Sequence, residues 1–322
     1  MTGRRRMESK ILKRSGFQQA SIAVEGLKGR GWKKGAMVLL KLPFGLFQSF
    51  GIVKAFRPDL VLGVGGYSAG PLCLAARIKG IPTAIHEQNS FPGLTNRLLC
   101  RIAHRVFISF EESREHFPGG DLILTGNPVR RELLAGASQV KKNSGFTVLV
   151  TGGSQGARAV NQAFTAALGI LKKKGRALGV IHQTGEIDYE PVAEAYKQGR
   201  FEGDVRPFIE DMAEAYGRAD MVIGRAGATT VSELAALGKP AILIPYPYAA
   251  NNHQETNAGM LVRAGGAEML LEERLTGEVL ADLLLKYMED SVALEEMGIR
   301  SKAVGRADAA GVIVDRLMEM MR

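Results

Sequence analysis

The sequence predicts an α/β protein made of two doubly wound domains in tandem. Short apolar segments alternate with longer amphipathic segments along most of the chain, and this alternation is typical of parallel sheets built from βαβ units. The 322 residues suffice for two ordinary domains, each with its own core. A polar stretch rich in small residues, Leu134–Gly145, separates the two series of segments, and we interpret it as a linker.

The short apolar segments have the length of buried strands. The expected strands are Asp59–Gly63, Thr83–His86, Arg105–Ser109, Asp121–Thr125, Phe146–Thr151, Leu178–Gln183, Met221–Gly224, Ala241–Pro245 and Ala267–Leu271. The expected helices are about Gly70–Lys79, Gly93–Ala103, Gln155–Lys174, Tyr189–Gln198, Met212–Arg218, Val231–Leu237 and Asn252–Ala264. We therefore expect one domain over residues 1–135, a second over 145–305, and a C-terminal helix over 306–322 that packs back on the first domain.

The composition and net charge indicate which kinds of molecule the protein binds. A net charge of +9 with 46% hydrophobic residues fits a globular protein that meets phosphorylated small molecules or anionic lipid. The sequence has no helix-turn-helix, zinc-finger or aromatic RNA-binding signature, so we expect no nucleic acid. No apolar run reaches the ~18 residues that span a bilayer, and no signal-peptide pattern is present, so we expect a cytoplasmic protein. Cys73 and Cys100 have neither metal-ligand nor redox spacing and are interpreted as small buried side chains.

Glycine-rich loops follow one expected strand in each domain. Ligand sites in doubly wound sheets form at the carboxyl ends of the strands. Gly63–Pro71 and Gly152–Arg158 both lead from a strand into a helix, where backbone N–H groups and the helix dipole attract phosphate. In the second loop the Ser154 hydroxyl can bond a phosphate oxygen, although the loop lacks the ending of a P-loop. A tight turn without a ligand is the alternative for the first loop.

Two further strand ends carry polar residues. Within Gly224–Glu233, Thr230 and Glu233 have the spacing of a capping box, with Thr230 as the N-cap. Alternatively this helix N-terminus holds a diphosphate and Glu233 binds the hydroxyls of a ribose, and the two interpretations can coexist. His86–Asn89 places four polar side chains at the end of a buried strand, which is costly unless they are paired or used in function.

Taken together, these segments resemble the MurG family, the UDP-N-acetylglucosamine:undecaprenyl-diphosphate-muramoylpentapeptide N-acetylglucosaminyltransferases. The segments that carry the resemblance are GVGGYSAGP from Gly63, HEQN from His86, GLTNR from Gly93, TGNPVR from Thr125, GGSQGARAVN from Gly152, HQTG from His182, FIEDM from Phe208, RAGATTVSELAALGKPAILIPYP from Arg225 and NNHQETNA from Asn251. They cover nearly the whole chain in the expected order. The resemblance implies the GT-B type of fold, in which two Rossmann-like parallel-sheet domains face a cleft.

The resemblance places the sugar donor on the second domain. It implies that Ser154 and the helix N-terminus at Thr229 and Thr230 contact the diphosphate. By the same resemblance, the backbone of Ile209 lies against uracil and Glu233 binds the ribose.

The resemblance also implies the remaining contacts. His253 and Gln254 hold the N-acetylglucosamine, while Asn89 and Arg130 reach the donor from the other side of the cleft. The acceptor's diphosphate is expected on the first glycine loop, at Gly65, Gly66, Tyr67 and Ser68. No Asp-x-Asp pair occurs, so we expect neither a metal nor another cofactor, and helix dipoles with backbone donors stabilise the departing UDP instead.

A membrane face is expected at Lys28–Phe50. This segment mixes lysine and arginine with leucine, phenylalanine and tryptophan, which suits an anionic membrane surface. An ordinary helix that packs its apolar side on the sheet is the alternative. With a lipid-linked acceptor, the membrane interpretation predicts a peripheral protein on the inner face of the bacterial cell membrane.

The sequence departs from the family pattern at its start. Members of the family begin with a strand and a GGTGGH-type loop whose histidine is proposed as the general base, and no such loop occurs here. We therefore expect an incomplete first domain, with sugar transfer by this chain weak or absent. The catalytic base is unknown from the sequence, and Glu87 and His86 are the candidates.

The leading hypothesis is transfer of N-acetylglucosamine from UDP-N-acetylglucosamine to lipid I, giving lipid II with inversion, in peptidoglycan synthesis. The alternative from another class is a UDP-sugar-binding module that is non-catalytic or completed by a partner chain. A lesser alternative is a UDP-N-acetylglucosamine 2-epimerase, which needs no membrane face and does not explain HEQN together with TGNPVR.

Overall fold

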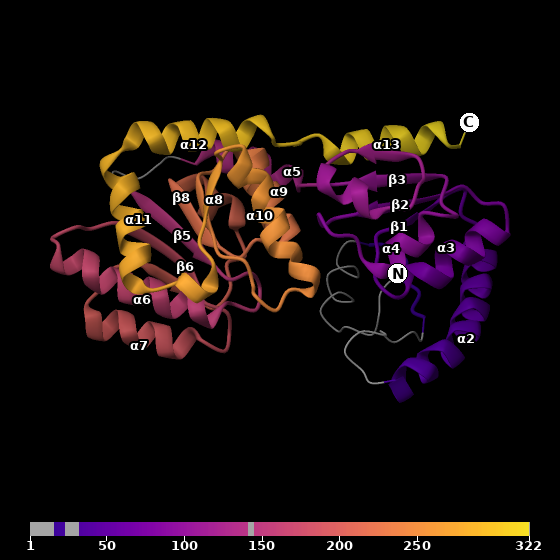
Figure 1. Cartoon of the computed structure of the whole chain (residues 1–322), viewed down its shortest axis with the longest axis horizontal. Helices are drawn as coiled ribbons and strands as arrows, with labels where there is room; N and C mark the ends of the chain where they lie inside the picture. The colour runs from indigo at the N-terminus through magenta and orange to yellow at the C-terminus, as the bar shows by residue number, and fades with distance from the viewer. Residues whose placement is uncertain (1–15, 23–31, 141–144, 322) are drawn as a thin grey trace. The chain divides into compact units, whose positions relative to one another are not determined.

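The computed structural model describes residues 16–22, 32–140 and 145–321. The chain folds into two compact units (Figure 1). The first comprises Met1–Thr125 and Gly311–Arg322, and the second comprises Gly126–Ala310. Each unit has its own parallel sheet, so the predicted α/β class with two Rossmann-like sheets is confirmed.

The sheet of the first unit has four parallel strands in the order β1-β2-β3-β4. They are β1 (Val61–Gly63), β2 (Thr83–Glu87), β3 (Arg105–Ile108) and β4 (Leu122–Leu124). The helices of this unit are α2 (Trp32–Phe56), α3 (Ala69–Ile78), α4 (Leu94–Leu99) and α13 (Ala309–Glu319), with a 3-10 turn at Glu111–His116.

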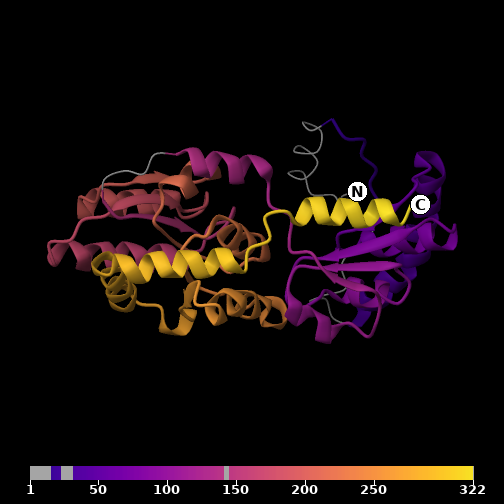
Figure 2. The same ribbon diagram turned by 90° about the horizontal axis from the view of Figure 1, so that it is seen from above.

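Helices cover both faces of this sheet. Ile85 and Val106 point to one face, where they pack with Cys73 of α3. Their neighbours Ala84 and Phe107 point to the other face and pack with Ile313 of α13, because successive side chains of a strand alternate between faces. Both views show α13 running along this sheet (Figures 1 and 2).

Polar contacts also hold α13 to the first unit. The Arg105 guanidinium donates to the Arg316 carbonyl at 2.6 Å and to the Glu319 carboxylate at 2.8 Å. Helix α13 therefore packs on a sheet whose strands come much earlier in the chain. The two hydrogen bonds join residues that are 211 and 214 positions apart in the sequence.

The sheet of the second unit has six parallel strands in the order β10-β9-β8-β5-β6-β7. They are β5 (Thr147–Thr151), β6 (Gly179–Gln183), β7 (Asp204–Arg206), β8 (Met221–Gly224), β9 (Ala241–Leu243) and β10 (Ala267–Met269). The strand order reverses between β5 and β8, so the loops after these two strands diverge at a topological switch point. Ligands of open α/β sheets bind at such points.

Eight described helices surround this sheet. They are α5 (Arg131–Gln139), α6 (Arg158–Lys173), α7 (Tyr189–Gly199), α8 (Met212–Arg218), α9 (Ala228–Leu237), α10 (His253–Arg263), α11 (Gly277–Glu289) and α12 (Ser291–Ala303), with 3-10 turns at Ala250–Asn252 and Glu272–Arg274. The largest core cluster joins α6 and α11 to the strands through buried side chains such as Phe164, Val148 and Leu284.

Two local expectations differ from the structure. The predicted linker is helical as far as Gln139, because Leu133 and Ala137 lie four residues apart and bury one side of α5. β7 was not predicted, because it has three residues, two of them charged, and pairs with β6 alone. Cys73 and Cys100 are buried free thiols, as predicted, and burial raises the pKa of Cys73 to about 12.

Candidate active site

The first glycine loop connects β1 to α3. Gly65 and Gly66 have φ of +82° and +76°, a conformation that strongly favours glycine. Gly63 allows the strand to approach the helix closely, since a Cβ there would lie 2.6 Å from the Cys73 Sγ. Ser68 stands at the N-cap of α3 without capping it through its side chain, and Tyr67 is 46% exposed. The loop thus presents backbone and an aromatic side chain to solvent at a helix N-terminus.

Glu87, at the end of β2, is only 2% exposed and accepts four hydrogen bonds. Its Oε1 accepts from the backbone N–H of Asn89 at 3.0 Å and from the side-chain amide at 3.3 Å. Its Oε2 accepts from the Gly93 N–H at 3.0 Å and from the Asn96 amide at 2.8 Å. These bonds shape the loop between β2 and α4, which favours a positioning role for Glu87 over proton transfer.

His86 is also buried, and both ring nitrogens have partners. The Gln88 amide nitrogen lies 3.1 Å from Nδ1, and the Ser109 hydroxyl lies 3.2 Å from Nε2. Since an amide NH₂ only donates, Nδ1 accepts and Nε2 carries the proton of the neutral ring. His86 and Glu87 are both buried from solvent. The identity of the general base stays a prediction.

Asn96 was missed as a single residue, although the GLTNR segment contains it. It is 1% exposed, and its amide donates to the His86 carbonyl at 3.1 Å as well as to Glu87. Its amide nitrogen would lie 3.5 Å from a Cβ on Gly65. Asn96 therefore lies under the glycine loop and ties three of the quoted motifs together.

The second glycine loop connects β5 to α6. Gly153 and Gly156 have φ of +81° and +76°, and a Cβ on Gly156 would lie 1.9 Å from the Thr184 carbonyl oxygen. Ser154 and Gln155 at the tip are exposed. Ala157 at the N-cap provides no side-chain cap, so the first turn of α6 faces the loop with backbone N–H groups.

The helix after β8 begins earlier than predicted. α9 starts at Ala228 with Gly227 as N-cap, so Thr230 lies inside the first turn and the capping-box interpretation is wrong. Thr229 is exposed beside it. This helix N-terminus and the loop after β5 both lie at the switch point of the second sheet, which is where an anionic ligand is best placed.

Glu233 lies on α9, where its Oε2 accepts from the Tyr216 hydroxyl at 3.0 Å. Burial raises the pKa of Glu233, while the Tyr216 hydrogen bond and the positive charge of Arg130 oppose the rise. Arg130 belongs to the second unit, whereas the sequence analysis expected it on the first domain, and its contact with the donor stays a prediction. Its backbone precedes α5, which packs on α8 of the same unit.

Ile209 follows β7 and is 3% exposed, while its neighbour Phe208 is half exposed. The Ile209 backbone N–H donates to the Gln183 Oε1 at 2.8 Å. The Ile209 backbone N–H, one of the groups predicted to face uracil, is therefore already hydrogen-bonded within the protein.

The NNHQ segment lies at the start of α10. Asn251 and Asn252 have φ of 57° and 51°, a left-handed conformation that asparagine tolerates better than most residues. Gln254 accepts from the Tyr246 N–H at 3.0 Å, and the His253 Nδ1 lies 2.8 Å from the Ala250 carbonyl. The two residues predicted to hold the sugar are thus fixed by the backbone around them.

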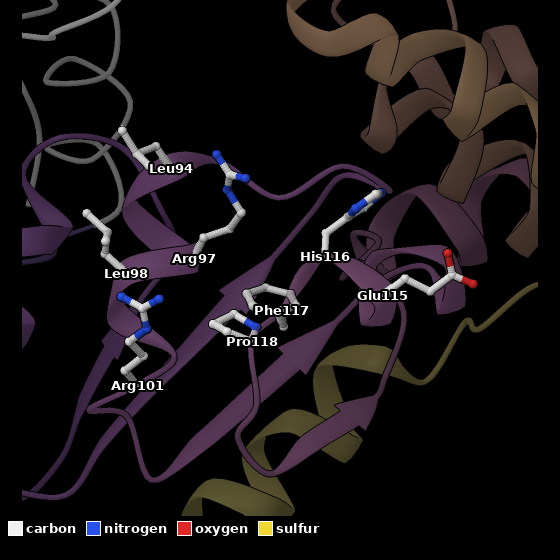
Figure 3. Close-up of a pocket in the computed structure, with 8 residues that line it drawn as sticks. All are labelled: Leu94, Arg97, Leu98, Arg101, Glu115, His116, Phe117 and Pro118. Carbon is white, nitrogen blue, oxygen red and sulfur yellow. The ribbon is translucent and has the colours of Figure 1, made fainter.

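A cavity of about 370 Å³ lies elsewhere in the first unit, beside α4 (Figure 3). Its Arg97 guanidinium lies 5.6 Å from the centre of the Phe91 ring, and its Nε is buried without a hydrogen-bond partner. None of the predicted donor or acceptor residues lines it, although Leu94 and Arg97 belong to the GLTNR segment. The lining residues are Leu94, Arg97, Leu98, Arg101, Glu115, His116, Phe117 and Pro118.

Two Rossmann-like units, the second with a glycine turn and a helix N-terminus at its switch point, have the architecture of GT-B type glycosyltransferases. Family models agree. Residues 1–108 match the glycosyltransferase family 28 N-terminal domain, and residues 147–313 match its C-terminal domain. The chain belongs to the MurG family of this class, as its similarity to individual members shows.

Two relatives are named UDP-N-acetylglucosamine–N-acetylmuramyl-(pentapeptide) pyrophosphoryl-undecaprenol N-acetylglucosamine transferase. The protein from Syntrophus aciditrophicus is 47% identical, over 99% of this chain and 89% of the relative. The protein from Geobacter sulfurreducens is 44% identical, over 98% of this chain and 88% of the relative.

Solved structures agree with this assignment. The crystal structure of MurG from Acinetobacter baumannii superposes with a TM-score of 0.78 at 33% identity, covering 97% of this chain and 88% of that one. A UDP-N-acetylglucosamine 2-epimerase from Neisseria meningitidis gives a TM-score of 0.66 at 15% identity, covering 98% and 90%. At that identity the epimerase shares the fold alone.

Proposed function

We propose that this protein transfers N-acetylglucosamine from UDP-N-acetylglucosamine to the lipid-linked muramoyl-pentapeptide acceptor, lipid I, to give lipid II in peptidoglycan synthesis. The observation that carries the proposal is the pairing of the glycine turn after β5 with the N-terminus of α9 at one switch point. Such a pair offers backbone N–H groups and two helix dipoles to a diphosphate. The names of the relatives supply the substrates.

The reaction is a displacement at the anomeric carbon of the donor sugar. The muramoyl 4-hydroxyl attacks this carbon, its proton passes to a base, and the bond to the β-phosphate oxygen breaks with inversion. UDP leaves with the electron pair. The Ser154 hydroxyl and the N–H groups at Thr229 and Thr230 stabilise the negative charge that develops on the diphosphate, a role that needs no metal.

The remaining donor contacts follow the resemblance. Glu233 binds the ribose hydroxyls, because its carboxylate has acceptor sites beyond the one that Tyr216 uses. The Ile209 segment lies against uracil, and His253 and Gln254 hold the sugar.

The acceptor diphosphate binds the first glycine loop in this proposal. Gly65 and Gly66 let the backbone approach the phosphates, and Tyr67 and Ser68 provide hydroxyls at the N-terminus of α3. The protein acts without nucleic acid, at the inner face of the cell membrane.

Helix α2 supports the membrane contact. Phe44 and Phe47 are 56% and 76% exposed, which is unusual for a helix that only packs on a sheet. Residues 28–31 of the predicted membrane segment lie outside the described residues. A second cavity, of about 690 Å³, adds basic and apolar side chains near the end of α2, namely Phe50, Val53, Lys54, Arg57, Pro58, Ile78, Lys79 and Ile81. Among the described helices, none has the length and apolar character to cross a bilayer.

The decisive experiment measures UDP release and sugar transfer with UDP-N-acetylglucosamine and a short-chain lipid I analogue. Transfer that depends on the analogue supports the proposal. Donor binding without transfer would instead support a UDP-sugar-binding module that is non-catalytic or completed by a partner. Formation of UDP-N-acetylmannosamine without acceptor would show an epimerase.

A further inference from the structure

Gln183 ends strand β6 within the HQTG segment, to which the proposed function gives no role. The residue is 4% exposed, so its amide is removed from solvent and must find partners inside the fold. Its backbone lies between β5 and β7, opposite Thr151 on one side and Arg206 on the other.

Three hydrogen bonds satisfy the Gln183 amide. Its Nε2 donates to the Gly153 carbonyl at 2.9 Å and to the Thr151 hydroxyl at 3.2 Å. Its Oε1 accepts from the Ile209 N–H at 2.8 Å. Both amide hydrogens and the amide oxygen are therefore used. A glutamate in its place lacks the donors and a lysine lacks the acceptor.

These partners belong to different loops of the proposed donor site. Gly153 is in the turn proposed to hold the diphosphate, and Ile209 is in the segment proposed to lie against the base. The Thr151 hydroxyl also accepts from the Gly153 N–H at 3.1 Å, so it fixes the start of the same turn. One buried side chain thus joins the turn after β5 to the segment after β7.

The backbone around Gln183 is packed closely enough to transmit this constraint. A Cβ on Gly185 would lie 2.4 Å from the Gln155 carbonyl oxygen, so the loop after β6 touches the glycine turn. The Thr184 N–H donates to the Arg206 carbonyl at 3.0 Å, and the Gly185 N–H to the Pro207 carbonyl at 3.0 Å. The loops after β5, β6 and β7 therefore form one continuous layer.

We infer that Gln183 is a positioning residue that sets the separation between the diphosphate subsite and the base subsite of the donor site. The inference rests on the proposed function, since it assigns both subsites to one nucleotide. A ligand that spans both subsites, such as UDP, depends on their separation. Uridine occupies the base and ribose subsites but does not reach the diphosphate subsite, so its binding does not depend on this separation.

The test replaces Gln183 in the full chain and measures binding of UDP and of uridine by calorimetry or competition. Q183M has a similar length but neither donates nor accepts. Q183E keeps an acceptor for the Ile209 N–H but turns an oxygen toward the Gly153 carbonyl. Q198M is the matched control, because Gln198 is an exposed glutamine on α7 that bonds only Glu194 among the described contacts.

The expected result is a UDP dissociation constant raised about tenfold in Q183M and Q183E, as expected for losing one or two net hydrogen bonds. The uridine dissociation constant stays within about twofold of wild type, because uridine does not reach the diphosphate subsite. Q198M matches wild type for both ligands. Thermal unfolding of each variant gives the folded fraction against which the constants are corrected. If Q183M fails to fold, Q183E and T151V, which removes one of the three bonds, carry the comparison.

Two results would overturn the inference alone: UDP affinity unchanged in both Gln183 variants, or equal losses for UDP and uridine, which indicate a general packing role. A wild-type chain that binds neither ligand would overturn the proposed function and this inference with it. The two failures are therefore distinguishable.

Discussion

Strands β2 and β6 belong to different units, yet both end on a buried histidine followed by a second buried polar residue. At β2 the pair is His86 and Glu87, and at β6 it is His182 and Gln183. In both histidines Nδ1 accepts and Nε2 donates, since the His182 Nδ1 lies 3.1 Å from the Tyr196 hydroxyl and its Nε2 lies 3.1 Å from the Asn161 Oδ1.

The second residue of each pair makes the difference. Glu87 can only accept, and its donors all lie in the segment that directly follows its own strand, from Asn89 in the loop to Asn96 in the first turn of α4. Gln183 both donates and accepts, and it joins loops that follow two other strands. A carboxylate therefore organises one loop, whereas an amide connects two, and we expect the two sites to respond differently to substitution.

The largest effect is expected where the loop after β6 meets the glycine turn. In G156A an alanine takes a backbone position with φ of +76°, and its Cβ would lie 1.9 Å from the Thr184 carbonyl oxygen. The glycine turn must therefore move. We expect a loss of at least ~3 kcal/mol in unfolding free energy and about 100-fold weaker UDP binding. Calorimetry and chemical denaturation measure both.

G175A is the matched control for this substitution. Gly175 also has a positive φ, of +69°, but no atom lies within 4 Å of its Cβ position. G175A therefore has the backbone strain of a positive φ without a steric clash, and we expect it to lower the unfolding free energy by only ~1–2 kcal/mol. Equal effects of the two substitutions would show that the close approach to Thr184 is unimportant.

The second effect concerns pH. Burial lowers the pKa of His182 to about 4, whereas the unfolded chain titrates near 6.5, so the unfolded state binds the proton more readily between these values. Stability is fully present above pH 6.5 and falls by about 3 kcal/mol as pH drops to 4. Denaturation curves of wild type and H182Q test this. A difference between them that does not vary from pH 7 to 4 would contradict it.

The third effect tests the acceptor-only role of Glu87. In E87Q one acceptor oxygen becomes an NH₂ that faces N–H donors, and we expect a loss of ~2–3 kcal/mol in unfolding free energy of the first unit. UDP affinity should stay within about twofold of wild type, because the residues proposed to contact UDP all lie in the second unit. E115Q makes the same chemical change at an exposed carboxylate and should cost less than ~0.5 kcal/mol.

The smallest effect concerns Glu233, whose pKa burial raises. Since the folded state holds this proton more tightly than the unfolded state, its contribution to stability falls as pH rises from 4.5 through the raised pKa. Y216F removes the hydrogen bond that opposes the shift, so the pKa of Glu233 should rise further. A carboxyl titration followed by NMR would show this, and a fall would contradict it. We expect UDP affinity to decrease by about fivefold, because an ionised Glu233 is the better acceptor for ribose.

The sequence by itself determined the fold class, most of the strands and the ordered motifs that identify the family. The apolar periodicity of segments such as Thr147–Thr151 and the glycines of the two loops are local features, and they fix local structure wherever the chain places them. Buried strands in a parallel sheet are apolar on both faces, so they are easy to recognise.

Only the tertiary structure decided how polar groups pair. The start of α9 at Ala228, the placement of Arg130 in the second unit and the use of the Ile209 N–H by Gln183 all depend on partners far away in sequence. Local patterns carry no record of such partners. A buried polar atom takes whichever donor or acceptor the packing of strands and loops brings within hydrogen-bond distance, because leaving it unpaired in the interior costs more than any local preference.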